Sequence, residues 1–185
     1  MIKADFHVHT SSSDGLLSPK EAVYRAYKNN VKYLSITDHD TVSGLDEGFL
    51  ESQKYDISFI PGIELSTQYN NESIHVLGFF KDKNYKNNDF IKELEKIKNH
   101  RIIRAEKIVQ KLKDEFNIKI NFNKILQESK DTIARPHIAK AIIDAGYDYS
   151  HDEIFDKFIG KDSKAYVPTL KLSTEYGINL LKEYN

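Results

Sequence analysis

The spacing of hydrophobic residues in the first part of the chain alternates between strand-like and helix-like periods. The opening segment alternates apolar and polar residues through IKADFHVH, which is the two-residue period of a β-strand. Two more strands are predicted in the apolar runs KYLSITDHD and ISFIPGIEL, with a helix over about 43–54 between them. Strands and helices that alternate in this way are typical of parallel strands joined by helical crossovers, so we expect an α/β sheet or barrel.

Local sequence signals indicate where one helix begins and where one hairpin turns. Ser18 is followed by Pro19 and, three residues after the serine, by Glu21, which is the capping box of a helix N-terminus. We therefore expect a helix to begin at Pro19. Further along, two strand-like runs, ELSTQY and ESIHVLGFF, flank Asn70 and Asn71, a pair suited to a tight hairpin turn.

The middle of the chain follows a different pattern. From about residue 87, apolar residues recur at helical spacing for about thirty residues, with many Lys and Glu residues between them. Shorter helices are expected after it, over about 123–129, 135–145 and 151–159. A last helix would be capped by Ser173 or Thr174. We interpret the chain as an N-terminal α/β part over 1–90, an inserted helical subdomain over 91–164, and a return to the first part over 165–185.

The composition narrows the class of protein. With 185 residues, 39% of them hydrophobic and 30% charged, the chain is long enough to bury the core of a soluble globular domain. The net charge of −1 gives no general attraction to nucleic acid or to an anionic membrane surface. The absence of cysteine excludes disulfides and thiolate metal sites. The N-terminus lacks the apolar core of a secretory signal, and no apolar run approaches the roughly 20 residues that cross a bilayer, so we expect a cytoplasmic protein without a membrane partner.

Side chains that bind metals follow the predicted strands at their carboxyl ends. His7 and His9 are two residues apart in a strand, so their side chains point to the same side. The other candidates are Asp14, Asp38, His39, Asp40 and Glu64. Because the carboxyl ends of parallel strands lie on one face of the fold, these side chains are expected to converge. Imidazole and carboxylate ligands suit Mn²⁺, Fe²⁺ or Zn²⁺, and their number favours two or three ions, with a carboxylate such as Glu64 bridging.

Several segments together resemble a known family. The successive motifs of the polymerase and histidinol phosphatase (PHP) superfamily resemble, in order, FHVHTSSSDG, ITDHDT, PGIE and IHVLGF. Stand-alone PHP phosphoesterases that act on nucleotide phosphates carry a later motif that resembles ARPHIAKAI. The resemblance extends over nearly the whole chain. It implies a distorted (β/α)7 barrel with an inserted helical subdomain.

The resemblance also implies a role for each candidate residue. The implied ligands are His7 and His9 on one ion, Asp14 and His39 on another, Glu64 as the bridge, and His75 on a further ion, with Mn²⁺ the expected metal. Arg135 and His137 resemble the phosphate-contacting pair of the subgroup, and a planar guanidinium suits phosphate because it bonds two oxygens at once. Asp38 and Asp40 are expected to orient metal-bound imidazoles or water, although a helix N-cap is an equally good interpretation for one of them.

The sequence departs from the family pattern near its end. The family supplies further ligands from an Ala-His-Pro-like strand end and a late Ser-Asp-x-His-like motif, and neither occurs up to Asn185. We therefore expect the barrel and the metal site to be incomplete at the C-terminus, as in a partial chain of a longer protein.

The sequence as a whole predicts a metal-dependent phosphoesterase. A metal-bound hydroxide is expected to attack phosphorus, while the ions and Arg135 neutralise the charge that develops. The resemblance implies a nucleoside 5′-monophosphate, a 3′,5′-bisphosphate or the 5′ end of a short RNA as the substrate. A histidinol-phosphate phosphatase is the alternative within the family. An inactive module that only binds metal or phosphate is the alternative from another class, and the oligomeric state is not predicted.

Overall fold

The computed structural model describes residues 2–129, 132–169 and 171–184. Contacts within the chain divide it into two compact units. The first unit comprises Met1–Ile97 and Lys171–Asn185, and the second unit comprises Lys98–Leu170. The first boundary falls inside one long helix, α3 (Asn88–Phe116), so the chain passes from one unit to the other without a loop.

The first unit contains both strands and helices, whereas the regular elements described in the second unit are all helices. The elements of the first unit are β1 (Lys3–Val8), α1 (Pro19–Lys28), β2 (Val31–Ile36), α2 (Leu45–Ser52), β3 (Ser58–Phe59), β4 (Gly62–Tyr69), β5 (Glu72–Phe79), the 3-10 helix η1 (Lys83–Lys86), the start of α3, β6 (Leu172–Ser173) and α7 (Thr174–Glu183). The second unit holds the rest of α3, α4 (Phe122–Glu128), α5 (Arg135–Asp144), α6 (His151–Ile154) and the π-helical turn η2 (Phe155–Ile159).

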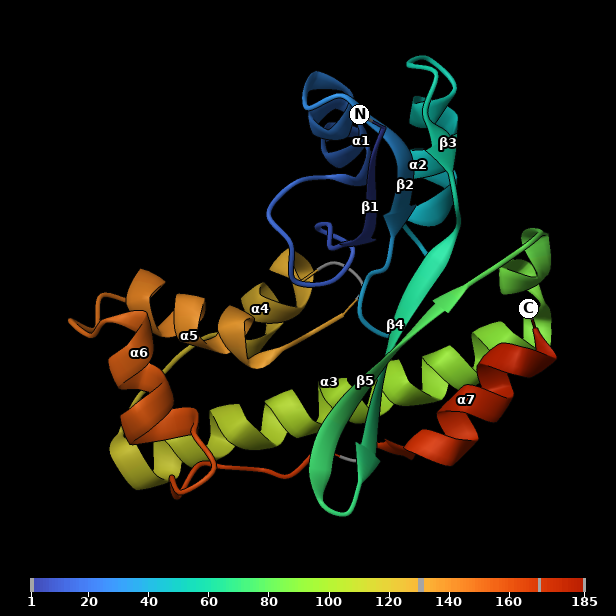
Figure 1. Cartoon of the computed structure of the whole chain (residues 1–185). Helices are drawn as coiled ribbons and strands as arrows, with labels where there is room; N and C mark the ends of the chain where they lie inside the picture. The colour runs from blue at the N-terminus through green and yellow to red at the C-terminus, as the bar shows by residue number, and fades with distance from the viewer. Residues whose placement is uncertain (1, 130–131, 170, 185) are drawn as a thin grey trace. The chain divides into compact units, whose positions relative to one another are not determined.

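The described strands of the first unit form two three-stranded sheets (Figure 1). In the first sheet, with the order β1-β2-β3, neighbouring strands are parallel, as the alternation of strands and helices predicted. The strand expected over 57–65 is divided, because β3 ends at Phe59 and β4 begins at Gly62. Pro61 lies in the break, where its ring removes a main-chain donor from the ladder. The break lets β4 leave the first sheet and join the second.

The second sheet is built on the predicted hairpin. β4 and β5 are antiparallel, and Asn70 and Asn71 between them both have positive φ angles, of 46° and 65°. Such angles are typical of the tight turns that match the twist of a hairpin. β6 pairs with the other edge of β4 in the parallel direction. Within the described residues both sheets are open, so the structure shows a mixed α/β fold. The expectation of a (β/α)7 barrel that is incomplete at the C-terminus stays a prediction.

Helices cover the sheets of the first unit and bury its core. α1 begins as predicted, since Ser18 Oγ accepts a hydrogen bond from the Glu21 main chain and the Glu21 carboxylate accepts one from the Ser18 main chain. Fully buried side chains of this core include Val23, Ile36, Ile63 and Leu65. α7 is capped by Ser173, one of the two residues predicted for that role. It packs so closely on β5 that a Cβ atom at Gly78 would lie 2.5 Å from Leu181 Cδ2.

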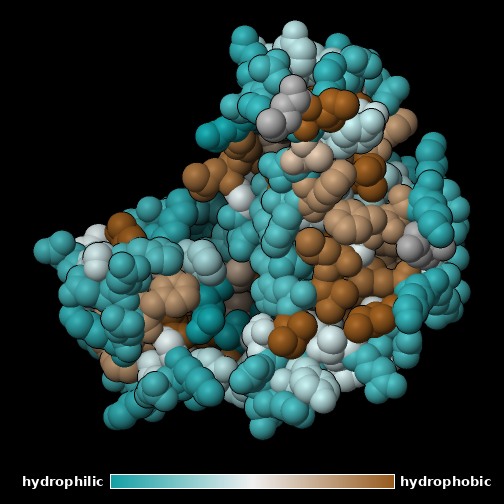
Figure 2. Space-filling view, viewed as in Figure 1, coloured by the Kyte–Doolittle hydropathy of each residue, from teal (hydrophilic) through white to brown (hydrophobic). Residues whose placement is uncertain are grey.

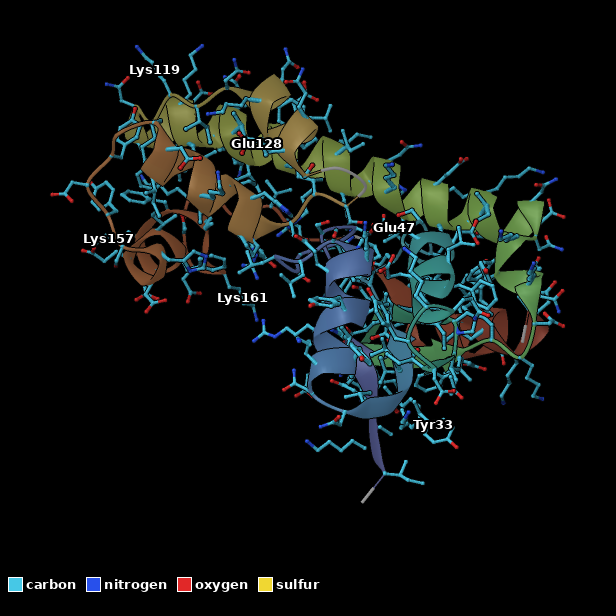
Figure 3. The ribbon with its side chains drawn as sticks, turned by 90° about the horizontal axis from the view of Figure 1, so that it is seen from above. Tyr33, Glu47, Lys119, Glu128, Lys157 and Lys161 are labelled. Carbon is cyan, nitrogen blue, oxygen red and sulfur yellow. The ribbon has the colours of Figure 1, made fainter. Side chains whose placement is uncertain are left out.

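One face of the first unit exposes large apolar side chains over its strands (Figure 2). Phe6 on β1 is 42% exposed and Phe79 on β5 is 37% exposed, and their rings meet edge to face with centroids 6.1 Å apart. Tyr33 projects from β2 into solvent (Figure 3). An open groove of about 260 Å³ lies between β5 and α7, with Phe79 and Ile178 in its lining.

The helices of the second unit enclose a core of their own. Its fully buried aliphatic side chains are Ile108 and Leu112 on α3, Ile142 on α5, Ile154 on α6 and Ile159 on η2. The long helix predicted from residue 87 is observed as α3, with 29 residues, and the shorter helices lie where they were predicted. Lys119 points into solvent (Figure 3), whereas Glu128 pairs with Lys140 on α5 and Lys157 pairs with Glu153 on α6. None of the helices in the described part of the chain is both long and apolar enough to cross a bilayer.

Candidate metal centre

The two sheets of the first unit meet at the predicted metal-binding residues. His39 follows β2, Glu64 lies on β4, and the two residues form an isolated parallel bridge. Main-chain hydrogen bonds hold this bridge, from Asp40 N to Glu64 O (3.0 Å) and from Glu64 N to Asp38 O (3.1 Å). The bridge fixes an imidazole from one sheet beside a carboxylate from the other.

Glu64 lies at the centre of a cluster of imidazoles. Its side chain is 5% exposed, and its Oε2 atom lies 3.0 Å from His7 Nε2, 2.8 Å from His9 Nε2 and 3.4 Å from His39 Nδ1. The other oxygen, Oε1, lies 2.8 Å from His75 Nδ1. His7 and His9 reach the same oxygen because side chains two residues apart leave a strand on the same side, as the sequence predicted.

Asp14 forms a second carboxylate centre beside the first. Its Oδ1 atom lies 3.2 Å from His9 Nδ1, and its Oδ2 atom lies 3.7 Å from His39 Nε2. The loop between β1 and α1 carries Asp14 back toward the end of β1, where His9 lies. His9 and His39 therefore each contact both carboxylates.

These contacts make three overlapping groups of possible metal ligands. The groups are His7, His9 and Glu64; His9, Asp14 and His39; and His39, Glu64 and His75. In each group one ligand atom from every residue lies within 4.8 Å of the others. Two ligand atoms about 2.1 Å from one ion, at octahedral or tetrahedral angles, lie about 3.0–3.4 Å apart. The observed separations of 2.8–3.7 Å bracket this range. The cluster is therefore able to hold metal, and the identity of the ligands stays a prediction.

The protonation states of the cluster favour cations. The imidazole of His9 lowers the pKa of Asp14 to about 2, and Asp14 in turn raises the pKa of His9. Burial alone would raise the pKa of Glu64, but the neighbouring imidazoles of His7, His39 and His9 outweigh it, and the pKa lies below its usual value. Burial lowers the pKa of His39. Near neutral pH both carboxylates are ionised and His39 is neutral, which are the forms that bind a divalent ion.

One buried atom tests whether the residues fit a metal. Among the residues that the structure describes, His9 Nδ1 is buried and makes no hydrogen bond, although Asp14 Oδ1 is close to it. A buried polar nitrogen without a hydrogen bond is costly. An ion between His9 Nδ1 and the Asp14 carboxylate would satisfy both atoms, so the donor set fits a divalent cation.

The aspartates on either side of His39 contact the main chain and hydroxyl groups. Asp38 accepts hydrogen bonds from Thr10 and Ser13, which lie in the loop before Asp14. Asp40 Oδ1 accepts a hydrogen bond of 2.7 Å from Ser66 N on β4. The N-cap of α2 is Gly44, so the prediction that one of these aspartates caps that helix was wrong. The sequence analysis did not predict these contacts of Asp38. The hydroxyl-rich segment TSSSDG, residues 10–15, is the feature that could have indicated them.

Arg135 and His137 begin α5 in the second unit. The guanidinium of Arg135 donates from Nη1 to Ile159 O (3.3 Å) and lies over the ring of Phe155, 5.4 Å from its centroid. His137 Nδ1 accepts a hydrogen bond of 3.1 Å from Ala134 N. If neutral, the His137 ring then carries its proton on Nε2. These contacts stabilise the helix start, and the phosphate-binding role of the pair stays a prediction.

Comparison with protein families decides the relationship. The model of the PHP domain matches residues 5–158, most of the chain. The chain belongs to the PHP domain family. The PHP chain is 30% identical to the 5′-3′ exoribonuclease of Haemophilus influenzae over 89% of its own length and 59% of that relative. It is 27% identical to the 3′,5′-nucleoside bisphosphate phosphatase of Chromobacterium violaceum, over 90% of its own length and 58% of the relative. The PHP chain thus spans about three fifths of the length of these curated relatives.

Solved structures show the same fold. A protein from Bifidobacterium adolescentis described as a metal-dependent phosphoesterase is 29% identical to the PHP chain, with a TM-score of 0.88 over 99% of this chain and 64% of that one. An amidohydrolase from Chromobacterium violaceum with bound sulfate is 26% identical, with a TM-score of 0.86 over 98% of this chain and 64% of that one. The mixed α/β fold of the PHP chain is therefore that of PHP-like phosphoesterases.

Proposed function

We propose that the PHP chain supplies the metal centre of a phosphoesterase that hydrolyses nucleotide phosphates or shortens RNA from its 5′ end. The observation that carries the proposal is the overlap of three His–carboxylate groups that share His9, His39 and Glu64. Such overlap suits two or three ions a few ångströms apart, which is the arrangement that clamps a phosphoryl group. The names of the relatives, a 5′-3′ exoribonuclease and a 3′,5′-nucleoside bisphosphate phosphatase, support the substrate class.

The buried and the exposed residues of the cluster would have different roles. Divalent ions held there, with Mn²⁺ the expected metal and Fe²⁺ or Zn²⁺ as alternatives, would supply Lewis acidity and an activated water. Glu64 and Asp14 would balance the charge of the ions, and the buried Glu64 carboxylate would set their spacing. The side chains of His7 and His75 are 52% and 39% exposed, so the cluster is open to solvent on that side. A phosphate ester would approach from there.

Arg135 and His137 would bind the substrate. The described contacts of the Arg135 guanidinium use one of its N–H groups, so other donors remain to pair with two phosphate oxygens. Pairing with Arg135 would favour a doubly charged phosphate over a neutral alcohol.

The test is a side-by-side assay of candidate substrates. Purified chain supplied with Mn²⁺ would be given a nucleoside 3′,5′-bisphosphate, a nucleoside 5′-monophosphate, a 5′-phosphorylated short RNA and histidinol phosphate. We expect phosphate release or 5′ shortening with the first three and loss of that activity in Glu64→Gln. Arg135→Ala is expected to lower kcat as well as raise KM, because Arg135 would bind the phosphate and also neutralise the charge that develops on it.

Two outcomes would count against the proposal. Preferred hydrolysis of histidinol phosphate would move the substrate class to the alternative within the family. A chain that binds Mn²⁺ but hydrolyses none of the four compounds would support a binding module instead.

A further inference from the structure

Asp38 is a buried carboxylate that contacts the loop carrying Asp14. It is 1% exposed and accepts three hydrogen bonds, each of 2.6 Å. Oδ1 accepts from Thr10 N and Ser13 Oγ, and Oδ2 accepts from Thr10 Oγ1. Thr10 and Ser13 are themselves 0% and 2% exposed. Bonds from neutral donors to an ionised acceptor, away from water, are stronger than ordinary ones.

The same loop is closed on itself by its main chain. Ser13 N and Gly15 N both donate to Thr10 O, at 3.0 and 2.9 Å. A Cβ atom at Gly15 would lie 2.5 Å from His9 O, so the loop touches the end of β1. A Cβ atom at Gly44 would lie 3.2 Å from Asp38 Oδ2, which shows that the start of α2 packs against the same carboxylate. Both neighbours of Asp14 in the sequence are therefore held in place.

We propose that Asp38 is a positioning residue that fixes Asp14 within the group His9, Asp14 and His39. The inference rests on the proposed function only in requiring that this group bind a divalent ion. Without the Asp38 contacts, the loop would be less ordered before an ion binds, and the binding energy would be reduced by the cost of ordering it. Residues that orient a ligand from behind typically change metal affinity by about 10- to 100-fold when they are removed.

Asp40 holds a different part of the same centre. It has a positive φ angle of 54°, its main-chain N–H donates to Glu64 O, and its side chain accepts from Ser66 N. These bonds are to β4 and not to the loop. The two aspartates beside His39 thus contact different parts of the centre. Asp38 bonds to the loop that carries Asp14, and Asp40 bonds to the strand that carries Glu64.

The experiment compares two hydroxyl deletions in the same loop. Ser13→Ala removes the 2.6 Å bond to Asp38 together with a longer contact of 3.4 Å to Asp14 Oδ1, so Asp38→Asn is needed beside it to isolate the role of Asp38. Ser12→Ala removes a neighbouring hydroxyl that does not bond to Asp38 in the described structure. Asp38→Asn removes the charge and is the stronger perturbation. Hydrogen exchange of the metal-free protein would follow the Thr10 and Gly15 amides. Mn²⁺ titration, read by electron paramagnetic resonance, would then count the ions and their affinities.

We expect Ser13→Ala and Asp38→Asn to speed exchange at Thr10 and Gly15 about tenfold or more, and Ser12→Ala to leave it unchanged. Exchange at Leu65 on β4 should not change, since a positioning role is local. In the Mn²⁺ titration, Asp38→Asn should weaken one ion by about 10- to 100-fold and leave the others at their wild-type affinity.

Three results would overturn the inference. The first is unchanged exchange at Thr10 in Asp38→Asn. The second is an equal loss of all ions together with a lower melting temperature, which a general structural role would produce. The third is wild-type protein that binds no Mn²⁺. A wild-type chain that binds Mn²⁺ without hydrolysing phosphate esters would instead remove the proposed function and leave the positioning role in place.

Discussion

Replacement of Glu64 by glutamine should separate the three ligand groups of the metal centre. Glu64 belongs to the group with His7 and His9 and to the group with His39 and His75, and it is the only carboxylate in either. The group around Asp14 does not contain it. Glu64→Gln keeps the shape of the side chain and removes its charge. We therefore expect two ions to be weakened and one to be retained.

The size of the effect follows from the charge that is lost. A carboxylate and a divalent ion about 2.1 Å apart attract by about 16 kcal/mol at an effective dielectric constant of 20. Desolvation of the buried charges offsets most of this attraction. A net loss of about 3 kcal/mol for each affected ion corresponds to a dissociation constant about 100-fold higher.

The assay is a Mn²⁺ titration of wild type, Glu64→Gln and a matched control, followed by metal analysis of the protein after gel filtration. Glu51→Gln is the control, because Glu51 is about as buried as Glu64, at 5% and 4% exposed. Glu51 lies on α2 and bonds to Lys54 and Tyr55, which follow that helix, and not to the metal-binding candidates. The control should bind as many ions as wild type. Equal stoichiometry and affinity in Glu64→Gln and wild type would refute the ligand sharing on which the reasoning depends.

Three further predictions concern the stability of the first unit. Burial and Asp46 raise the pKa of Tyr85 to about 12, so the folded state keeps the phenol proton at a pH where the unfolded state loses it. The free energy of unfolding should therefore fall by about 2 kcal/mol from pH 10 to 12. Denaturant titrations of Tyr85→Phe should lack this fall, and an identical slope in both proteins would contradict the assignment. Gly78→Ala should cost about 1–3 kcal/mol in thermal unfolding, because the new methyl group would overlap Leu181; a neutral result would mean that α7 moves away freely. Ser18→Ala should cost about 1 kcal/mol in the same measurement through loss of the α1 cap, and Ser18→Thr should recover most of it.

Much of the local structure followed from periodicity and from turn and cap signals. The cap at Ser18, the Asn70-Asn71 turn and the long helix α3 are determined by neighbours in the sequence, and all were predicted. The break at Pro61 was missed, because the apolar run continues through it and only pairing with two different sheets divides the strand. The incomplete (β/α)7 barrel was expected from the resemblance alone, since no local pattern in the chain required it.

The convergence of the candidate metal ligands was predictable from the sequence, whereas the hydrogen bonds of Asp38 to the loop before Asp14 were not. The side chains of His7, His9 and Glu64 converge as predicted, but only the two histidines lie at the carboxyl end of a parallel strand. Glu64 lies near the start of β4 and is brought to them by its bridge with His39. The hydrogen bonds of Asp38 join residues that are 25 and 28 positions apart, and no periodicity links positions so distant. Sequence reasoning therefore found the side chains that converge on Glu64 and missed the loop contacts of Asp38.

Shared ligands make the loading of the centre a coupled equilibrium. An ion bound by His9 and Glu64 restrains residues that also serve its neighbours, so each ion lowers the ordering cost of the next, while repulsion between the two positive charges acts in the opposite direction. The coupling is reciprocal, since whatever one ion does to the affinity of a second, the second does to the first. Mn²⁺ binding should accordingly depart from a set of independent sites. The fraction of fully loaded protein would then change more steeply or more gradually with Mn²⁺ concentration than any single dissociation constant predicts.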